Sequence, residues 1–277
     1  MRVLVAGAAG FLGSNLSGRL LSAGHDVTGV DDLSTGLLSA TAEARRSSHF
    51  RFHRLDVAGG GLLDLMARER PDVVLHAAGS GEPGRDLDAT AALAGTAARL
   101  VLLSCASVYG DVRGPVTERA GLAPVTTPAA GQVAREAVVE AAGRRGGRVV
   151  VLRLATVYGP GDRRGPVART LAGAALPDGG TTVRDLLHVE DLAELVLQVL
   201  DGRADGRRLN VGTGVATTDR ALHTAVARQL GRPDAPTYAP DPGTGSPLLD
   251  CSVARRLLGW EAAVDLESGL SRTMSTT

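Results

Sequence analysis

The chain has 277 residues, enough for one large domain or a domain and a half. Its formal net charge is zero and only 3% of its residues are aromatic, which argues against nucleic acid as a partner. No run approaches the ~18 apolar residues of a membrane span, and two cysteines make neither a disulfide framework nor a metal site. We therefore expect a soluble, cytoplasmic protein with reduced cysteines, no metal and no membrane partner.

The N-terminal stretch predicts a strand, a tight glycine turn and a helix. An apolar run over residues 3–6 meets Gly7, and glycines recur at Gly10 and Gly13 as helical periodicity begins. In a dinucleotide-binding turn the first glycine permits the bend, and the second lets backbone N–H groups approach a pyrophosphate. The third allows the helix to pack closely on the strand. An ordinary turn between a strand and a helix is the alternative.

A second apolar run, residues 27–30, ends at Asp31, where the acid that binds a cofactor ribose is expected about 20 residues after the glycines. Asp31 and Asp32 together would repel a 2′-phosphate and accept hydrogen bonds from a free ribose diol. We therefore predict NAD rather than NADP as the cofactor. For Asp32, a solvated turn residue is the alternative.

Strand-like and helix-like segments alternate through the first two-thirds of the chain, which predicts an α/β fold with a doubly wound parallel sheet. Further strands are expected over 50–55, 73–77, 100–103 and 149–154, and helices over 62–70, 86–99 and 129–144. The start of the first helix and the turns after the strands supply the other candidate cofactor contacts: Phe11, Leu12, Ser34, Thr35, Gly36, Asp56, Val57, Ala77, Ala78 and Gly79.

Proline and glycine become frequent over residues 159–180, as expected where a second lobe begins. Helices are predicted over 190–200, 217–230, 252–258 and 266–273, a short strand begins at residue 209, and the proline-rich segment 232–247 reads as a loop. We predict a Rossmann-type domain over 1–155, completed by about 185–212. Residues 156–184 and 213–277 would form a small α/β substrate-binding lobe.

A series of stretches, in order, resembles the extended short-chain dehydrogenase/reductase family, specifically its NAD-dependent nucleotide-sugar epimerases and dehydratases. The resemblance implies a Rossmann fold, bound NAD, a nucleotide-linked sugar in a cleft above the nicotinamide ring, and in many members a homodimer. The matching stretches are Gly7–Gly13, Val30–Gly36, Asp56–Val57, His76–Gly79, Arg153–Gly161, Arg184–Asp191, Asn210–Gly214 and Ala254–Trp260.

The chain departs from that family at the residues that carry its chemistry. Members use a tyrosine that exchanges a proton with the substrate, and a lysine four residues later that lowers the pKa of the phenol. Counting from the preceding loop puts Ala129 at the tyrosine position and Val133 at the lysine position, and the chain contains no lysine. Arg135 lies nearby, but we expect it to point elsewhere on the helix, and an arginine is poorly suited to acid–base work.

Candidate replacements follow the strand at 100–103. Cys105 stands where the family has a serine or threonine, between Ser104 and Ser107. It could be a weak donor, a thiolate or simply a small buried residue. Tyr109 is the nearest phenol, with a structural packing role as the alternative. Glu118 could act as a base, or be solvated in its loop.

The resemblance also implies substrate contacts. Thr156 replaces an asparagine that members use, and Arg184 stands where the family has an arginine. Arg153 and Arg163 could join Arg184 in clamping a diphosphate, with surface ion pairs as the alternative. His188 is either substrate-facing or structural.

We predict an NAD-dependent enzyme that modifies nucleotide-linked sugars, specifically an epimerase that acts through a transient ketone with acid–base residues of its own. The acidic pair of the dehydratase branch would fall at Ala106 and Ser107, so dehydration by that mechanism is not expected. A catalytically silent NAD-binding regulatory or partner subunit is one alternative. A dehydratase or ketoreductase, or an enzyme whose substrate supplies the acid or base, is another.

Overall fold

The computed structural model describes residues 1–96, 98–112, 114–240 and 245–275. Its centre is a seven-stranded sheet in the order β10–β7–β5–β4–β1–β2–β3, in which every neighbouring pair is parallel. This confirms the predicted α/β, doubly wound architecture. The strands are β1 (Arg2–Ala6), β2 (Asp26–Asp31), β3 (Phe50–Arg54), β4 (Val73–His76), β5 (Arg99–Cys105), β7 (Val149–Leu154) and β10 (Arg207–Val211).

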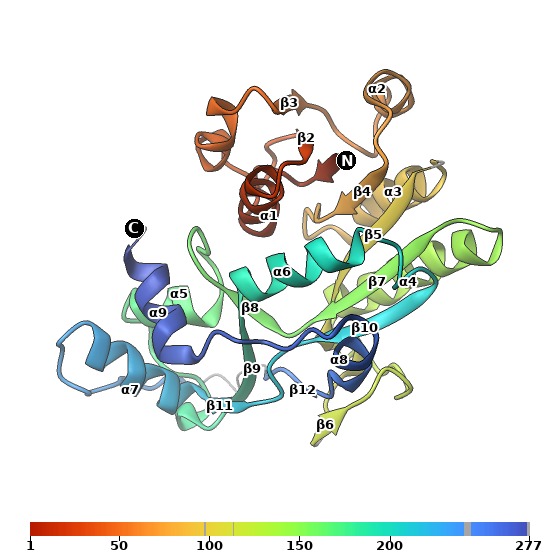
Figure 1. Ribbon diagram of the computed structural model, residues 1–277. Helices are drawn as coiled ribbons and strands as arrows, with labels where there is room; N and C mark the ends of the chain where they lie inside the picture. Colours follow the sequence, from red (N-terminus) through yellow and green to blue (C-terminus); the bar gives the residue numbers. More distant parts are fainter. Residues whose placement is uncertain (97, 113, 241–244, 276–277) are drawn as a thin grey trace.

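Alternate side chains of each strand point to opposite faces of the sheet, and both faces are buried under helices. Val3 and Val5 of β1 pack in one apolar cluster, and Leu4 and Ala6 pack in the other. The first cluster is closed by α1 (Phe11–Ser22) and α6 (Val189–Val199), and the second by α2 (Leu62–Glu69), α3 (Pro83–Ala94) and α4 (Thr127–Arg144). Figure 1 shows these helices around the sheet.

A smaller lobe lies at one side of the sheet (Figure 1). Its three-stranded sheet has the order β11–β9–β8, and an apolar cluster with Val167, Leu222 and Leu270 packs against it. The elements of this lobe are β8 (Thr156–Tyr158), α5 (Pro166–Leu171), β9 (Val183–His188), β11 (Ala216–Thr218), α7 (Asp219–Gln229) and α9 (Leu266–Ser275). A two-stranded pair, β6 (Pro115–Val116) and β12 (Leu248–Leu249), and α8 (Ser252–Leu258) complete the chain.

Several elements of the structure differ from the predicted ones. The helix expected over 86–99 begins at Pro83, whose fixed φ suits a first helical turn, and ends at Ala94. Strand β9 was not predicted and overlaps the start of the segment 185–212 that we assigned to the large domain. It pairs in the small sheet, whereas α6 packs on the large sheet and β10 joins it. The proline-rich loop holds a bridge between Leu176 and Tyr238. Residues 97, 241–244 and 276–277 of the predicted helix, loop and lobe lie outside the described residues.

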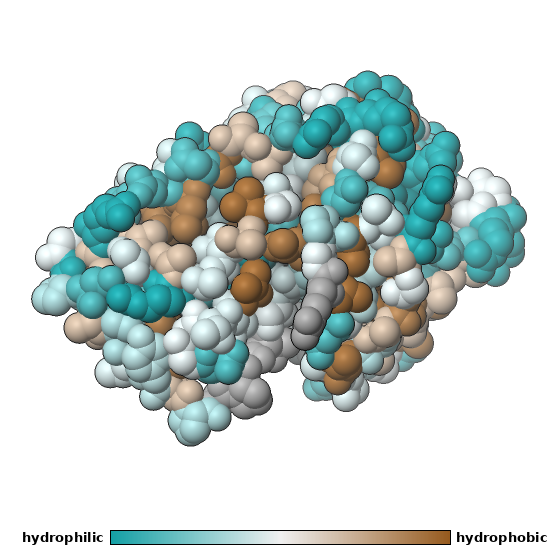
Figure 2. Space-filling view, turned by 90° about the horizontal axis from the view of Figure 1, so that it is seen from below, coloured by the Kyte–Doolittle hydropathy of each residue, from teal (hydrophilic) through white to brown (hydrophobic). Residues whose placement is uncertain are grey.

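The surface mixes polar and apolar residues. Figure 2 shows apolar residues toward the middle of the face seen from below and hydrophilic residues around its edge. Within the described ranges, none of the helices combines the length and the apolar character needed to cross a membrane.

Candidate cofactor and active site

The turn between β1 and α1 tolerates no side chain at two of its glycines. Gly7 has φ +87°, and a Cβ there would lie 2.7 Å from the backbone nitrogen of Ala78. Gly13 crosses so close to Gly7 that a Cβ would lie 2.0 Å from the Gly7 carbonyl oxygen. Gly10 is the N-cap of α1 and offers no side-chain cap, so the N–H groups of the first helical turn are left for another acceptor.

Asp31 ends β2 beside this turn and is almost fully buried. Its Oδ2 accepts a hydrogen bond from the backbone N–H of Ala9 at 2.9 Å, and its Oδ1 accepts one from Leu33 at 2.8 Å. Each oxygen keeps further lone pairs for a ligand. The carboxylate is therefore held rigidly, with acceptor capacity to spare.

One pocket collects most of the predicted cofactor residues at the carboxyl ends of β1 to β4. Its lining includes Gly7, Gly10, Asp31, Asp32, Ser34, Thr35, Asp56, Val57, Ala77, Ala78 and Gly79. Four predicted contacts lie outside that lining: Phe11, Leu12, Gly13 and Gly36. Gly13 instead packs on Gly7, and Gly36 on Ala9. Sequence reasoning missed Val30, Leu55, Ser80, Arg85, Asp86 and Ala89.

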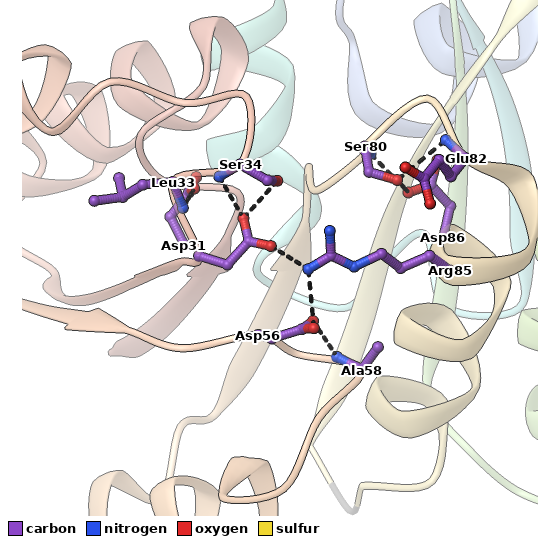
Figure 3. Close-up of polar contacts among 10 residues, drawn as sticks. Asp31, Leu33, Ser34, Asp56, Ala58, Ser80, Glu82, Arg85 and Asp86 are labelled. Carbon is purple, nitrogen blue, oxygen red and sulfur yellow. Dashed lines mark hydrogen bonds and ion pairs between the residues drawn. The ribbon is translucent and has the colours of Figure 1, made fainter.

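Arg85 joins two acidic loops across this pocket (Figure 3). Its Nη2 donates to the carboxylate of Asp32 and to Asp56 Oδ2, the latter at 2.9 Å. Ser34 donates to Asp32 Oδ1 from its backbone nitrogen and from its hydroxyl, at 2.9 and 2.7 Å. Burial raises the pKa of Asp32, but the bonds from Ser34 and the charge of Arg85 outweigh it, so the net shift is downward. Asp32 is thus both a turn residue and half of an ion pair.

A second pocket adjoins the first, because Gly79 and Asp86 line both. Helix α4, capped by the Thr126 hydroxyl, turns one face toward it. The rest of its lining is Gly81, Pro83, Cys105, Ser107, Pro128, Gly131, Gln132 and Arg135.

On α4, the positions that face this pocket lie one residue before the two that we assigned to the family's tyrosine and lysine. Residues 128, 132 and 135 share a helical face and line the pocket. Ala129 is buried, and Val133 packs against the main apolar cluster. The prediction that Arg135 points elsewhere is wrong, because its side chain reaches the pocket.

Arg135 is a buried cation held by neutral groups; its side chain is 3% exposed. Nε donates to Thr90 Oγ1 at 2.8 Å, and Nη2 donates to the Ala78 carbonyl at 2.9 Å and to His76 Nε2 at 3.0 Å. Nη1 donates to Gln132 Oε1 at 3.2 Å. Burial lowers the pKa of Arg135; burial and then the charge of Arg135 hold the pKa of His76 well below its usual value. His76 is therefore a neutral acceptor.

Cys105 and Ser107 lie together in the lining of the same pocket. The Cys105 Sγ and the Ser107 Oγ are 2.7 Å apart, and either can donate. Burial raises the pKa of the Cys105 thiol. The neutral thiol is therefore favoured over the thiolate, and Cys105 can act as a weak donor.

A buried polar network lies beside this pocket and engages other predicted residues. Ser104 donates to Glu136 Oε1 at 2.6 Å, and Arg153 pairs with the same carboxylate at 2.6 Å. Arg153 Nη1 donates to the Tyr109 hydroxyl at 3.0 Å, which donates to Asn210 Oδ1 at 2.7 Å. Burial raises the pKa of Tyr109. Ser104 and Tyr109 are thus bonded in the interior, and Arg153 forms a buried pair, neither a diphosphate clamp nor a surface bridge.

The remaining predicted residues lie apart from the two pockets. Glu118 Oε1 accepts a hydrogen bond from the backbone N–H of Asn210 at 2.8 Å. His188 is buried against Tyr158 in an edge-to-face contact, with ring centroids 5.2 Å apart. The Nδ1 of His188 accepts a 3.4 Å bond from Glu190 N, which caps α6. Burial lowers the pKa of His188, so this imidazole is neutral and structural in its contacts.

Two arginines that were predicted to contact the substrate lie in the small lobe. Arg184 Nε pairs with Asp219 Oδ1 at 2.6 Å, and both line a small pocket between α5 and α7. Arg163 Nη2 donates to the Thr35 carbonyl at 3.3 Å, which links the lobe to the cofactor pocket. Thr156 opens β8 and is partly buried.

The sequence is similar to a known family of proteins over most of its length. A family model for the NAD dependent epimerase/dehydratase family matches residues 3–212. The chain is 36% identical over 310 aligned residues to a UDP-glucose 4-epimerase of Mycolicibacterium smegmatis, covering 99% of this chain and 97% of the relative.

Two solved structures have the same fold over their whole length. The UDP-glucose 4-epimerase of Thermotoga maritima with UDP-glucose has a TM-score of 0.89 at 28% identity, covering 100% of this chain and 98% of that one. The Thermus thermophilus UDP-glucose 4-epimerase in complex with NAD has a TM-score of 0.87 at 28% identity, with the same coverage. Since the family model spans well over half of the sequence, the chain belongs to the NAD dependent epimerase/dehydratase family, and its cofactor is NAD.

Proposed function

We propose that the protein is an epimerase of nucleotide-linked sugars that works through a transient ketone. The observation that carries this proposal is the pair of adjoining pockets, which share Gly79 and Asp86. One pocket suits a dinucleotide, and the other adjoins it and presents the polar side chains of Asp86, Ser107 and Gln132. The epimerase relatives, one of them bound to UDP-glucose, support the same substrate class.

The residues present fit NAD. The uncapped first turn of α1 suits pyrophosphate oxygens, and the spare acceptor capacity of Asp31 suits a ribose diol. Bound NAD would accept a hydride from a sugar carbon and return it to the ketone. Arg85 would hold the loops of Asp32 and Asp56 together around the cofactor and offset their charge.

Two of the catalytic residues proposed from the sequence face the second pocket. Cys105 and Ser107 both line it, and each can donate a hydrogen bond. We propose that they hold the sugar oxygen that becomes the carbonyl. Arg184, Arg163 and Thr156 are proposed contacts to the nucleotide diphosphate, because they lie on the lobe that would cover it.

Epimerisation is favoured over dehydration because a dehydratase must also expel a hydroxyl group. Such a reaction needs an additional acid, and the family's acidic pair is replaced by Ala106 and Ser107. Neither an alanine nor a serine side chain can supply that acid at neutral pH.

The test is to mix the purified protein and NAD with UDP-, GDP-, CDP- and dTDP-linked hexoses. Products are analysed by NMR, and transient NADH by its absorbance. We expect one nucleotide-sugar to give its epimer with a small transient NADH signal. NAD binding without product or NADH from any sugar would contradict the proposal and favour a silent NAD-binding subunit.

A further inference from the structure

We propose that Asp86 is the general base and acid of the second pocket, and that Arg135 is the buried cation beside which it works. This inference rests on the proposed function and names the groups that replace the missing tyrosine and lysine. Asp86 was not among the site residues predicted from the sequence, which placed it only at the start of a helix.

Asp86 lies where the two pockets meet, on the first turn of α3. Its Oδ1 accepts hydrogen bonds from the backbone N–H and the hydroxyl of Ser80, at 2.6 and 2.8 Å. Arg85 and Asp86 are adjacent but point different ways, Arg85 toward Asp56 and Asp86 toward Ser80 (Figure 3). One residue thus holds the cofactor loops, and the next faces the seam of the pockets.

The second oxygen of Asp86 is available. Oδ2 accepts no hydrogen bond from the part of the chain that the structure describes, and the side chain is only partly buried. A Cβ added at the neighbouring Gly79 would still lie 3.8 Å from Oδ2, so this residue does not crowd the oxygen. One oxygen is therefore fixed by Ser80, and the other is free to meet a substrate hydroxyl.

The chemistry of the pocket lining leaves Asp86 as the proton acceptor. It is the only carboxylate among the described residues that line the second pocket. Arg135 only donates, and the Gln132 amide and the Ser107 hydroxyl are not bases at neutral pH. Burial raises the pKa of the Cys105 thiol and keeps it protonated. His76 lies outside the lining, and its Nε2 already accepts from Arg135.

The proposed step balances in protons and electrons. The substrate O–H bond breaks, and its proton moves to Asp86 Oδ2. The O–H electron pair forms the second C–O bond as the C–H bond breaks and its electron pair leaves with the hydride to NAD. On the return, the carbonyl carbon regains the hydride on its other face and the oxygen regains the proton from Asp86. Nothing else is consumed.

Arg135 contributes its charge. Its five N–H groups make four hydrogen bonds to neutral acceptors, which leaves one Nη1 hydrogen, and no carboxylate of the described residues lies within ion-pair distance. A buried cation with no carboxylate in direct contact favours a negative charge forming beside it. The forming alkoxide and the carboxylate of Asp86 would both benefit from it.

The experiment compares the wild type with Asp86→Asn, which preserves the acceptor for Ser80. Asp88→Asn is the matched control, because Asp88 is exposed on the same helix and does not line either pocket. We expect kcat to fall on the order of 100-fold or more in Asp86→Asn, while calorimetry shows NAD and nucleotide-sugar affinities close to those of the wild type. Asp88→Asn should behave as the wild type.

Four further variants separate chemistry from structure. Asp86→Ala should recover turnover when formate is added, because a small carboxylate can enter the vacated space; Ser80→Ala should not respond to formate. Arg135→Gln should lower kcat with little change in KM, and Arg135→Lys should recover part of the loss by restoring the charge.

The outcomes distinguish the two proposals. An active wild type with an equally active Asp86→Asn, or an Asp86→Ala insensitive to formate, overturns the role of Asp86 and leaves the epimerase proposal standing. A wild type that converts no nucleotide-sugar overturns both.

Discussion

The cofactor pocket and the second pocket share Gly79 and Asp86, yet they are built from different materials. The cofactor pocket depends on backbone geometry: two glycines that cannot carry a side chain, and a carboxylate, that of Asp31, bound by backbone N–H groups. The second pocket depends on which side chains α4 turns inward, among them Gln132 and Arg135. The geometry of the turn that begins α1 is therefore independent of the side chains that line the second pocket.

The largest expected effect is a loss of stability, at a residue of α4 that belongs to the buried polar network and does not line the second pocket. Glu136→Gln leaves the fully buried Arg153 without its counter-charge, so the free energy of unfolding should fall by about 3–5 kcal/mol. Glu140→Gln, one turn later, breaks only partly exposed pairs with Arg144 and Arg208 and should cost less than about 1 kcal/mol. Urea unfolding followed by circular dichroism measures both. Equal losses would contradict the distinction between the network and the helix surface.

The next prediction breaks the cofactor pocket without touching the second one. Gly13→Ala puts a methyl group against the Gly7 carbonyl and should cost about 1–3 kcal/mol of stability, with a loss of NAD affinity on the order of tenfold or more. Gly18→Ala in the same helix meets nothing within 4 Å and should be neutral or stabilising. Calorimetric titration with NAD and thermal unfolding compare the two. Unchanged NAD binding in Gly13→Ala would remove the close-approach argument.

Arg85 tests whether the acids of the cofactor pocket need their shared cation. Arg85→Gln leaves Asp32 and Asp56 without that cation in the pocket that we propose for the anionic cofactor. NAD affinity should fall about tenfold, or ~1.4 kcal/mol, and more at low salt. Arg19→Gln removes an ion pair with Glu194 on the outer surface and serves as the control. Equal NAD affinities in the two variants would show that Arg85 has no part in binding.

The smallest effect concerns Tyr109, which a sequence comparison nominates as a substitute phenol. Tyr109→Phe removes the bonds to Arg153 and Asn210 and should cost about 1 kcal/mol of stability. Turnover should remain within about twofold of the wild type, because the hydroxyl is bonded in the interior. Steady-state kinetics and urea unfolding give the two numbers. Turnover that disappears from a stably folded variant would place Tyr109 in the active site.

Regular patterns made the large sheet and its cofactor turn predictable. The glycine spacing, the acid after the second strand and the alternation of strands and helices each reflect local geometry that a sequence carries directly. Strand β9 was not predicted as a strand, and its residues 185–188 fell within the segment assigned to the large domain, because a short apolar run carries no information about its pairing partner.

The second pocket was harder to predict for a physical reason. On a helix, a shift of one residue turns a side chain by about 100°, so an uncertain register around 128–135 decides whether Arg135 faces the pocket or the core. Asp86 and Arg85 were missed because their contacts with Ser80, Asp32 and Asp56 are to residues far away in sequence or in a loop. When a helix begins with several charged residues, the sequence does not indicate which of their side chains face a pocket.

The most direct test of the central claim is epimerisation of an accepted nucleotide-sugar in heavy water. If the hydrogen at the inverted carbon leaves as a hydride and returns from the cofactor, it never mixes with solvent, and only the hydroxyl proton passes through Asp86. We expect a product whose inverted carbon carries no deuterium by NMR or mass spectrometry. Deuterium at that carbon would show that it loses a proton rather than a hydride, and would contradict the ketone mechanism.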